Sequence, residues 1–153
     1  MSLSQSLCTS FKQQLLLAVH DFRVGGDTFK IALYTGNASL GPGTTAYTSD
    51  GEVTGTGYTA GGIALTSLGT GANATSMVAF ADFVDAVFSG VTLTARGALI
   101  YNSTPSALGP DGNPLVNPAV CVLDFGAERS AVGQDFTVQF PAADATNAIV
   151  RIG

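Results

Sequence analysis

The spacing of the hydrophobic residues changes close to residue 26 and separates a helical start from a long β-rich remainder. Before this point, five hydrophobic residues recur at the three- and four-residue intervals of one helix face: Phe11, Leu15, Ala18, Val19 and Phe22. Ser10 is followed three residues later by Gln13, which is typical of a helix-capping box. We therefore expect a helix at about residues 11–21, ended before Gly25 and Gly26.

After residue 26, hydrophobic and polar residues alternate, which is typical of β-strands with one buried face. In the segment 28–34, Phe29, Ile31 and Leu33 share one face, and the segment 91–101 alternates most regularly. Further strands are expected at 63–65, 120–125, 134–140 and 148–152, with two strands or one bent strand at 77–88, a short strand or extended loop at 47–53, and a turn at 69–73.

These elements predict the fold class. About seven to nine short strands, with turns roughly every 8–12 residues and no alternation of strands with helices, favour a mainly β fold. We expect a β-sandwich or a jelly-roll-like barrel with one short N-terminal α-helix. Residues 1–10 are expected to form an N-terminal arm, and residues 11–153 a single domain. Residues 102–118 contain four prolines and form the longest expected loop, and such loops usually make contacts.

The composition limits the classes of protein to which the chain can belong. Of its 153 residues, 46% are hydrophobic and 11% are charged, against about 25% charged in an average globular protein. The net charge is −5, with six Lys and Arg residues, so we expect no surface that binds nucleic acid through its phosphates. The scarcity of charge favours an exterior that partners cover in large part.

The two cysteines do not form a metal-binding or redox pair of the CxxC type, so both are expected to be reduced. Cys8 lies in a polar stretch and is expected to be exposed or at an interface, whereas Cys121 lies in an apolar strand and is expected in the core. No secretion signal is expected, because no basic region is followed by a long apolar run. The apolar run at 15–19 is too short to cross a membrane, so no membrane partner is expected.

The residues that usually carry chemistry form no recognisable set. His20 is the only histidine, and its neighbour Asp21 would point about 100° away from it on a helix, so the two predict no catalytic pair. We expect His20 at the surface or at the helix terminus. Asp111 and Asn113 could supply oxygen ligands, but the downstream Glu of a calcium-binding loop is missing. One His and two distant cysteines make no zinc site. We predict no catalytic residue, no cofactor and no metal.

Two glycine-rich segments invite comparison with phosphate-binding loops. Residues 36–43 lack the Gly-Lys-Ser/Thr ending of a P-loop, and residues 55–61 are one residue longer than a Gly-x-Gly-x-x-Gly loop. Both segments indicate turns and close backbone approach instead. The chain has only two glutamates, Glu52 and Glu128, and no Trp, which disfavours glycoside hydrolysis. We therefore expect a protein that is not an enzyme.

The order of residues is most distinctive in ten runs: 11–16, 20–22, 29–35, 47–48, 52–53, 55–62, 95–102, 122–126, 140–141 and 148–152. In these runs, which are spread over almost the whole chain, the sequence resembles a group of small virion structural proteins of tailed bacteriophages. The resemblance implies a shell or tail component that is present in many copies and has no catalytic activity.

The leading expectation is a capsid decoration, or cement, protein at the virion surface that bridges subunits of the phage major capsid protein. Self-association is also expected, with a homotrimer at a three-fold axis favoured, because it would bury apolar surface and multiply weak contacts. Six residues of the arm, the helix and the proline-rich loop are the expected contact residues: Leu3, Leu7, Phe11, Pro105, Pro110 and Pro114.

Two alternatives remain open. A neck, tail or baseplate component would differ from a cement protein chiefly in its copy number per virion. A receptor- or carbohydrate-binding module of the virion surface would use the four tyrosines as stacking platforms in place of Trp, although tyrosines buried on sheet faces explain them equally well. These tyrosines are Tyr34, Tyr47, Tyr58 and Tyr101.

Overall fold

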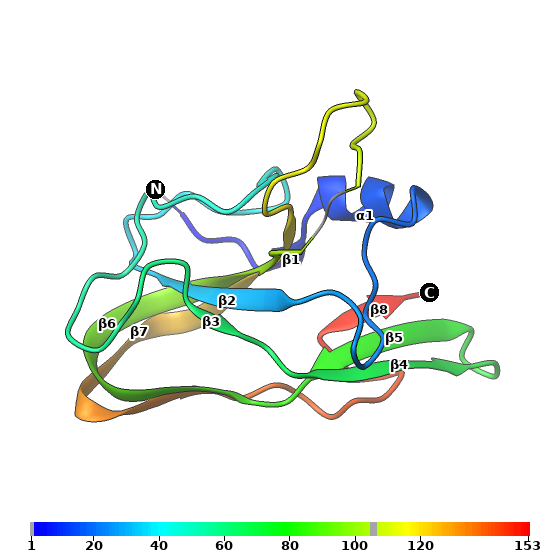
Figure 1. Ribbon diagram of the computed structural model, residues 1–153. Coiled ribbons are helices and arrows are strands. Elements are labelled where there is room, and N and C mark those ends of the chain that lie inside the picture. The colour runs from blue at the N-terminus through cyan, green and yellow to red at the C-terminus, as the bar shows by residue number, and fades with distance from the viewer. Residues whose placement is uncertain (1, 105–106) are drawn as a thin grey trace.

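The computed structural model describes residues 2–104 and 107–153, which form two antiparallel sheets and one short helix (Figure 1). The five-stranded sheet has the order β1-β7-β6-β2-β3, and the three-stranded sheet has the order β4-β5-β8. The elements are β1 Ser6–Leu7, α1 Thr9–Leu16, β2 Phe29–Tyr34, β3 Ile63–Ala64, β4 Ser67–Asn73, β5 Val78–Phe83, β6 Ala86–Asn102, β7 Ala119–Val138 and β8 Val150–Ile152. The predicted β-sandwich with one short helix is confirmed.

A long bent hairpin of β6 and β7 joins the two layers of the fold. Its pairing runs from Tyr101 opposite Ala119 to Ala86 opposite Val138, with four shifts of register. The hairpin curves at the left of Figure 1 from the layer of β2 into the layer beneath it. Residues 120–125 and 134–138 are in strand conformation as expected, but the expected break between them is wrong, because β7 continues through both segments. Bulges and glycines with positive φ let one strand bend where a turn was expected.

β2 lies between β6 and β3 in the upper layer, and it pairs with β6 along its whole length, from Phe29 opposite Asn102 to Tyr34 opposite Gly97. Apart from Lys30, its side chains are buried on both faces. A cluster of phenylalanines then ties the helix region to both sheets. The Phe22 and Phe29 rings stack at 4.3 Å between centroids, and Phe83 of β5 lies 5.6 Å from Phe29. Each such buried side chain stabilises the fold by roughly 1.5–3 kcal/mol.

The helix α1 is shorter than expected and starts earlier. It ends at Leu16 because Ala18 adopts a left-handed conformation, with φ 58°. The capping box is not formed: Cys8 occupies the N-cap, its side chain makes no hydrogen bond to the helix backbone, and the Ser10 hydroxyl faces the Thr44 carbonyl at 3.5 Å. Val19 and Phe22 are buried as expected, but they reach the core from the linker between α1 and β2.

The cysteine predictions are half correct. Cys8 is fully buried beneath α1, so its expected exposure is wrong, because the arm before it is held against the sheet. Cys121 is buried in β7, as expected for a core residue. Burial raises the pKa of the Cys8 thiol to about 11, so neither exposure nor ionisation favours its reaction.

The remaining differences lie at turns. Residues 69–73, expected as a turn, belong to strand β4, and the turn follows at residues 74–77, where Asn73 Oδ1 accepts hydrogen bonds from two backbone N–H groups. The run 77–88 does form two strands, β5 and the start of β6.

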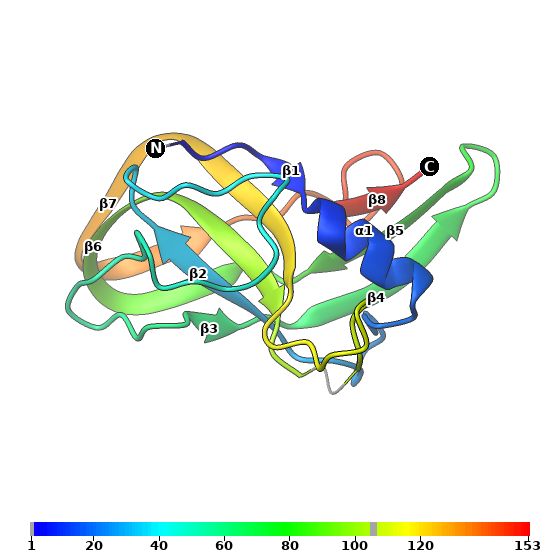
Figure 2. The ribbon, with the colours of Figure 1, turned by 90° about the horizontal axis from the view of Figure 1, so that it is seen from above.

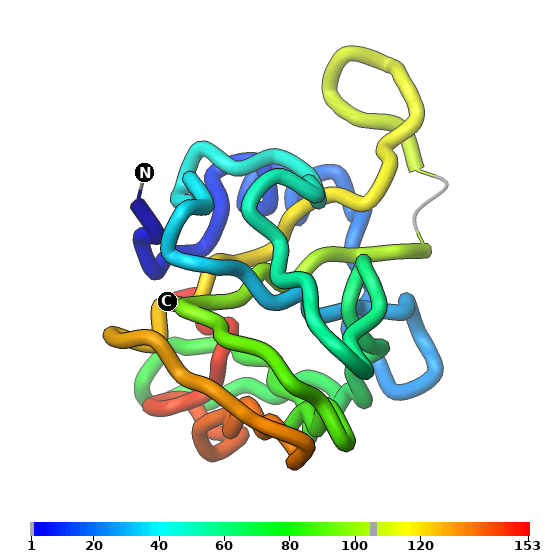
Figure 3. The backbone as a smooth tube through the Cα atoms, turned by 90° about the vertical axis from the view of Figure 1, so that its left-hand side faces the viewer, coloured from blue at the N-terminus to red at the C-terminus, as the bar shows by residue number. Residues whose placement is uncertain are grey.

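Of the proline-rich loop, residues 107–118 form a small projecting hairpin, closed by the bridge between Leu108 and Pro114 (Figure 3). No helix in the described part of the chain is long and apolar enough to cross a membrane.

Candidate interaction surface

A groove of about 650 Å³ lies between α1, the linker after it and the three-stranded sheet. Figure 2 shows α1 lying across this sheet. Most of the lining is apolar: Leu15, Phe22, Ala72, Ala79, Phe80, Ala81, Val150 and Ile152. We name this hollow the α1 groove, because α1 contributes Leu15 to its lining.

Several of the exposed hydrophobic residues lie on the elements that border the α1 groove, and one of them, Ile152, lines it. Of eleven large hydrophobic residues that are exposed in the described part of the chain, six lie on its bordering elements: Leu16, Leu17, Val24, Leu68, Met77 and Ile152. Leu16 is 88% exposed and Met77 is 80% exposed. Exposed apolar residues on the elements beside an apolar groove are typical of a surface that another molecule covers.

The sheet beneath the groove ends in two open edges, formed by β4 and β8. The seven residues of β4, Ser67–Asn73, contain no charged residue and no proline. Charges and prolines are the usual protection of an edge strand against pairing with another chain, so β4 is a weakly protected edge. It therefore adds backbone donors and acceptors to the apolar surface.

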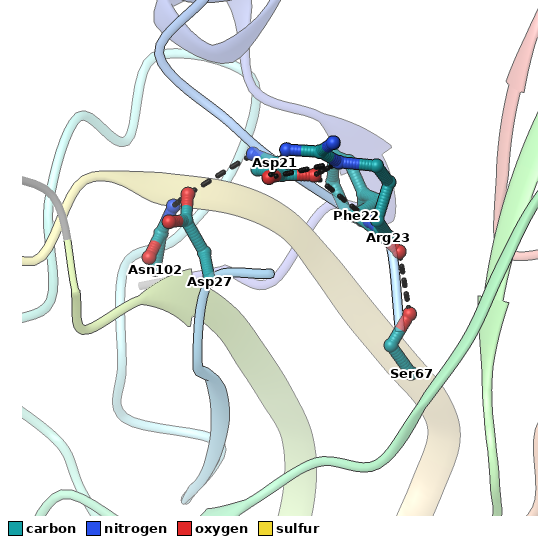
Figure 4. Close-up of polar contacts among 6 residues, drawn as sticks. All are labelled: Asp21, Phe22, Arg23, Asp27, Ser67 and Asn102. Carbon is teal, nitrogen blue, oxygen red and sulfur yellow. Dashed lines mark hydrogen bonds and ion pairs between the residues drawn. The ribbon is translucent and has the colours of Figure 1, made fainter. Parts of the chain in front are cut away.

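The linker at the mouth of the groove is fixed by polar contacts (Figure 4). Arg23 donates to both carboxylate oxygens of Asp21, the shortest contact being 2.6 Å. These bonds lower the pKa of Asp21 to about 2. The Ser67 hydroxyl donates to the Phe22 carbonyl at 2.6 Å and thereby ties the linker to β4. The groove wall thus has a defined shape without a partner.

His20 is half-buried and forms part of this wall, and it lies four residues beyond the end of α1, so its expected position at the helix terminus is wrong. Its Nε2 lies 2.8 Å from Gln14 Oε1, and its Nδ1 lies 3.0 Å from Asn102 Nδ2. The ring packs against Phe11, at 5.0 Å between centroids. Burial lowers the pKa of His20 to about 4, although the negative charge of Asp27 acts in the opposite direction. The helix ends before residue 20, so the ring can turn inward toward β6.

The four tyrosines surround Glu52 and hold the segment 35–62 to the sheet. Tyr47 donates to Glu52 Oε2 at 2.6 Å, and Tyr58 donates to Glu52 Oε1 at 2.7 Å. Tyr101 donates to the Gly61 carbonyl and Tyr34 to the Thr48 carbonyl. Two of the rings are buried and two are half-buried. This set satisfies its own hydrogen bonds, and it is a device that fixes a long loop.

A second hollow, of about 460 Å³, lies between β7 and the segment around Phe140. Its lining includes Gln5, Asp124, Arg129 and Gln139 beside apolar side chains. Six of the exposed large hydrophobic residues lie on the elements that border the α1 groove, and none of the eleven lines this second hollow, so we take the α1 groove as the candidate site. Among the described residues, no group of three or more His, Cys, Asp or Glu side chains could hold a metal ion.

The predicted contact residues do not lie together. Phe11 is fully buried, and Leu3 and Leu7 are partly exposed and pack on the core from the arm, where β1 pairs with β7. Pro110 and Pro114 are exposed on the projecting hairpin, and Pro105 lies outside the described residues. Phe11 thus offers no surface to a partner while α1 stays in place, because its ring fills the space beneath the helix.

Sequence reasoning missed the residues around the α1 groove. The signal available was the run Leu15, Leu16 and Leu17, because three consecutive residues spread over about 200° of a helix and cannot all face the core. Leu15 points into the groove lining, while the other two are exposed. The exposure of Val24 and Met77 depends on where the turns that contain them lie, and the sequence has no comparable signal for these turn positions.

Comparison of the chain with protein-family models, curated proteins and solved structures found no match.

Proposed function

We propose that the protein is a non-enzymatic structural component of a tailed-phage virion, and that it decorates the capsid by bridging subunits of the major capsid protein. The observation that supports this proposal best is the mostly apolar lining of the α1 groove, together with the exposed hydrophobic residues on the elements that border it. The low charge of the chain and its resemblance to small phage virion proteins agree with it.

The proposed mechanism is stabilisation by mass action. A domain that binds the assembled shell but not its separate subunits shifts the equilibrium toward the shell. In this proposal the α1 groove receives an apolar segment of a capsid subunit, and the arm and the projecting hairpin contact neighbouring copies. Self-association into a trimer would multiply these weak contacts, because the second and third contacts form within one assembly.

A neck, tail or baseplate component would use the same surface with other partners. Copy number separates the two locations. Quantitative mass spectrometry of purified virions should give a ratio near one copy per major capsid protein subunit for a decoration protein. A ratio at least about tenfold lower would indicate a neck or tail component, because the symmetric assemblies at those places contain few copies of each protein.

The receptor- or carbohydrate-binding alternative gains no support from the positions of the tyrosines. Tyr34 and Tyr101 are buried, and the hydroxyls of Tyr47 and Tyr58 are occupied by Glu52. A sugar-stacking platform needs an exposed ring face.

A matched pair of variants tests the role of the α1 groove. Val24 borders the groove and Val132 lies on the bend of β7, and each is 75% exposed. We expect Val24→Ser to weaken binding to capsids that lack the protein by about tenfold, the loss of one buried valine contact. Val132→Ser should bind like the unchanged protein. Equal binding by both variants and the unchanged protein, at equal thermal stability, would reject the groove as the contact surface.

A further inference from the structure

The hydrogen bonds around His20 define which of its nitrogens carries a proton. The backbone N–H of Thr104 donates to Asn102 Oδ1 at 3.0 Å, so the amide nitrogen of Asn102 points the other way. This nitrogen donates to Asp27 Oδ2 at 2.7 Å and faces His20 Nδ1 at 3.0 Å. Nδ1 must therefore accept, and Nε2 carries the proton that it donates to Gln14 Oε1.

A protonated imidazole does not fit this arrangement. A proton on Nδ1 would point at the amide hydrogens of Asn102, whose side chain is fully buried. Turning the amide around would place its oxygen against the carboxylate of Asp27 and would break the bond from Thr104. A charged His20 is therefore accommodated only when the ring moves away from the end of β6.

We propose that His20 is an acid-sensitive latch, which in its neutral form holds the end of α1 and the linker to the end of β6 and on protonation releases them. Gln14 links the ring to α1, and Asn102 links it to β6. Asp27 Oδ2 also accepts from the backbone N–H of Asp21, so that the same network fixes the linker. This inference does not depend on the proposed function.

The groups that face the imidazole decide the pH of release. Asp27, from the linker, is the acid that favours protonation, and its effect is outweighed by burial. Asp21 and Arg23 of the same linker neutralise each other in an ion pair. α1 presents the uncharged Gln14 and Phe11, and β2 presents Phe29.

The size of the effect follows from the two states of the ring. The pKa of His20 is about 4 in the closed state, and an open ring would titrate at its ordinary value near 6.5. Protons therefore bind the open state preferentially, and the opening equilibrium should grow about a hundredfold between pH 7 and pH 4. Release would also displace the wall of the α1 groove that Leu15, His20 and Phe22 form.

Hydrogen exchange of the full chain tests the latch. We expect the protection of peptides covering residues 9–24, corrected for the intrinsic rate at each pH, to fall about a hundredfold between pH 7 and pH 4. The protection of β6 peptides covering residues 93–102 should change less than tenfold. In His20→Gln, which cannot be protonated at this position, the fall at residues 9–24 should disappear. A parallel loss in both regions, or no loss at residues 9–24, would overturn the proposal.

The single histidine provides a second readout that needs no variant. The imidazole signals in NMR spectra belong to His20 alone, and we expect them to titrate well below pH 6.5 in the folded protein. A midpoint at or above 6.5 while the sheets remain folded would overturn the latch.

A matched pair of charge variants on α1 sharpens this readout. Gln14→Glu places a carboxylate at the atom that Nε2 contacts, and it should raise the midpoint by at least about one pH unit. Gln13→Glu adds the same charge at an exposed position of the same helix. It should shift the midpoint by less than about 0.3. Equal shifts in the two variants would mean that Gln14 does not hold the ring.

Discussion

The Tyr58 hydroxyl donates a hydrogen bond of 2.7 Å to Glu52 Oε1 and at the same time accepts one of 2.9 Å from the backbone N–H of Leu33. Leu33 lies in β2, whereas the other two residues lie in the long segment 35–62 that connects β2 to β3. Tyr58 thus joins the segment to β2, and Glu52 joins Tyr58 to Tyr47 and to the backbone of Gly61.

The first prediction concerns this carboxylate. Glu52→Gln keeps the shape of the side chain but removes the charge that strengthens three hydrogen bonds. We expect the free energy of unfolding to fall by about 1–2 kcal/mol, measured by urea denaturation at pH 7. The chain provides a control in its only other glutamate, because Glu128 is exposed. Glu128→Gln should change stability by less than about 0.5 kcal/mol, and comparable losses in both variants would contradict this role of Glu52.

The second prediction concerns alkaline pH. Burial, together with the nearby charge of Glu52, raises the pKa of Tyr101 to about 12. Burial and the bond to Glu52 raise the pKa of Tyr47 to about 12, and burial raises that of Tyr34 and Tyr58 as well. In the unfolded chain these groups lose their protons near pH 10. The stabilisation is therefore complete below pH 10 and is lost as the pH rises from 10 to 12.

Absorbance at 295 nm and circular dichroism, recorded over the same pH range, check this prediction. Tyrosinate should appear only above pH 11 or together with unfolding, and the urea midpoint should fall between pH 10 and pH 11. A tyrosinate signal with a midpoint near 10 in a protein that keeps its sheet spectrum would show that the tyrosines are not protected.

The parts of the fold that the sequence predicted are those that depend on local pattern. The alternation at 28–34 and at 91–101 corresponds to β2 and to most of β6. Only the first half of β6 has one buried and one exposed face, because β2 and the second half of β6 are buried on both faces. The end of α1 and the continuity of β7 depend on distant contacts. His20 turns toward Asn102, and glycines with positive φ bend β7 without ending it. Local pattern does not contain these relationships.

The candidate site was less predictable than the fold. The expected contact residues came from the arm, the helix and the proline-rich loop, and the structure shows that Phe11 belongs to the core. The exposure of Leu16 and Met77 follows from where α1 ends and where the β4–β5 turn begins. Both boundaries differ from the predicted ones, so the exposure of these two residues could not be predicted from the sequence.

The third prediction concerns the close approach of the segment 35–62 to β2. Gly62 has φ 75°, and a Cβ atom there would lie 1.7 Å from the carbonyl oxygen of Ile31. We expect Gly62→Ala to lower the free energy of unfolding by about 3 kcal/mol or more, because both the backbone angle and the backbone contact are unfavourable. Thermal unfolding provides the measurement. Gly43→Ala is the control, since nothing lies within 4 Å of its Cβ position. It should change stability by less than about 1 kcal/mol, and a Gly62→Ala protein as stable as this control would show that the approach is looser.

The fourth prediction concerns Asp82, which is 1% exposed at the end of β5. Its Oδ1 accepts from the backbone N–H of Phe83 at 2.8 Å, whereas its Oδ2 is buried without a hydrogen-bond partner in the described part of the chain. Burial, aided by the charges of Asp85 and Asp144, raises the pKa of Asp82 above its ordinary value of 3.8. The folded protein therefore prefers the neutral carboxyl, while the unfolded chain ionises it above pH 3.8. Stability is greatest below that pH and is lost as the pH rises through the raised pKa.

Asp82→Asn removes this pH dependence and keeps the oxygen that accepts from Phe83. We expect the variant to gain about 1 kcal/mol relative to the unchanged protein between pH 4 and pH 7, the cost of a buried charge that lacks a partner. Urea denaturation at pH 4, 5, 6 and 7 measures the difference, and Asp50→Asn, at an exposed aspartate, is the control that should show no such trend. If the difference between Asp82→Asn and the unchanged protein stays constant over this range, Asp82 is ionised in the folded state throughout, and the inferred preference for the neutral carboxyl is wrong.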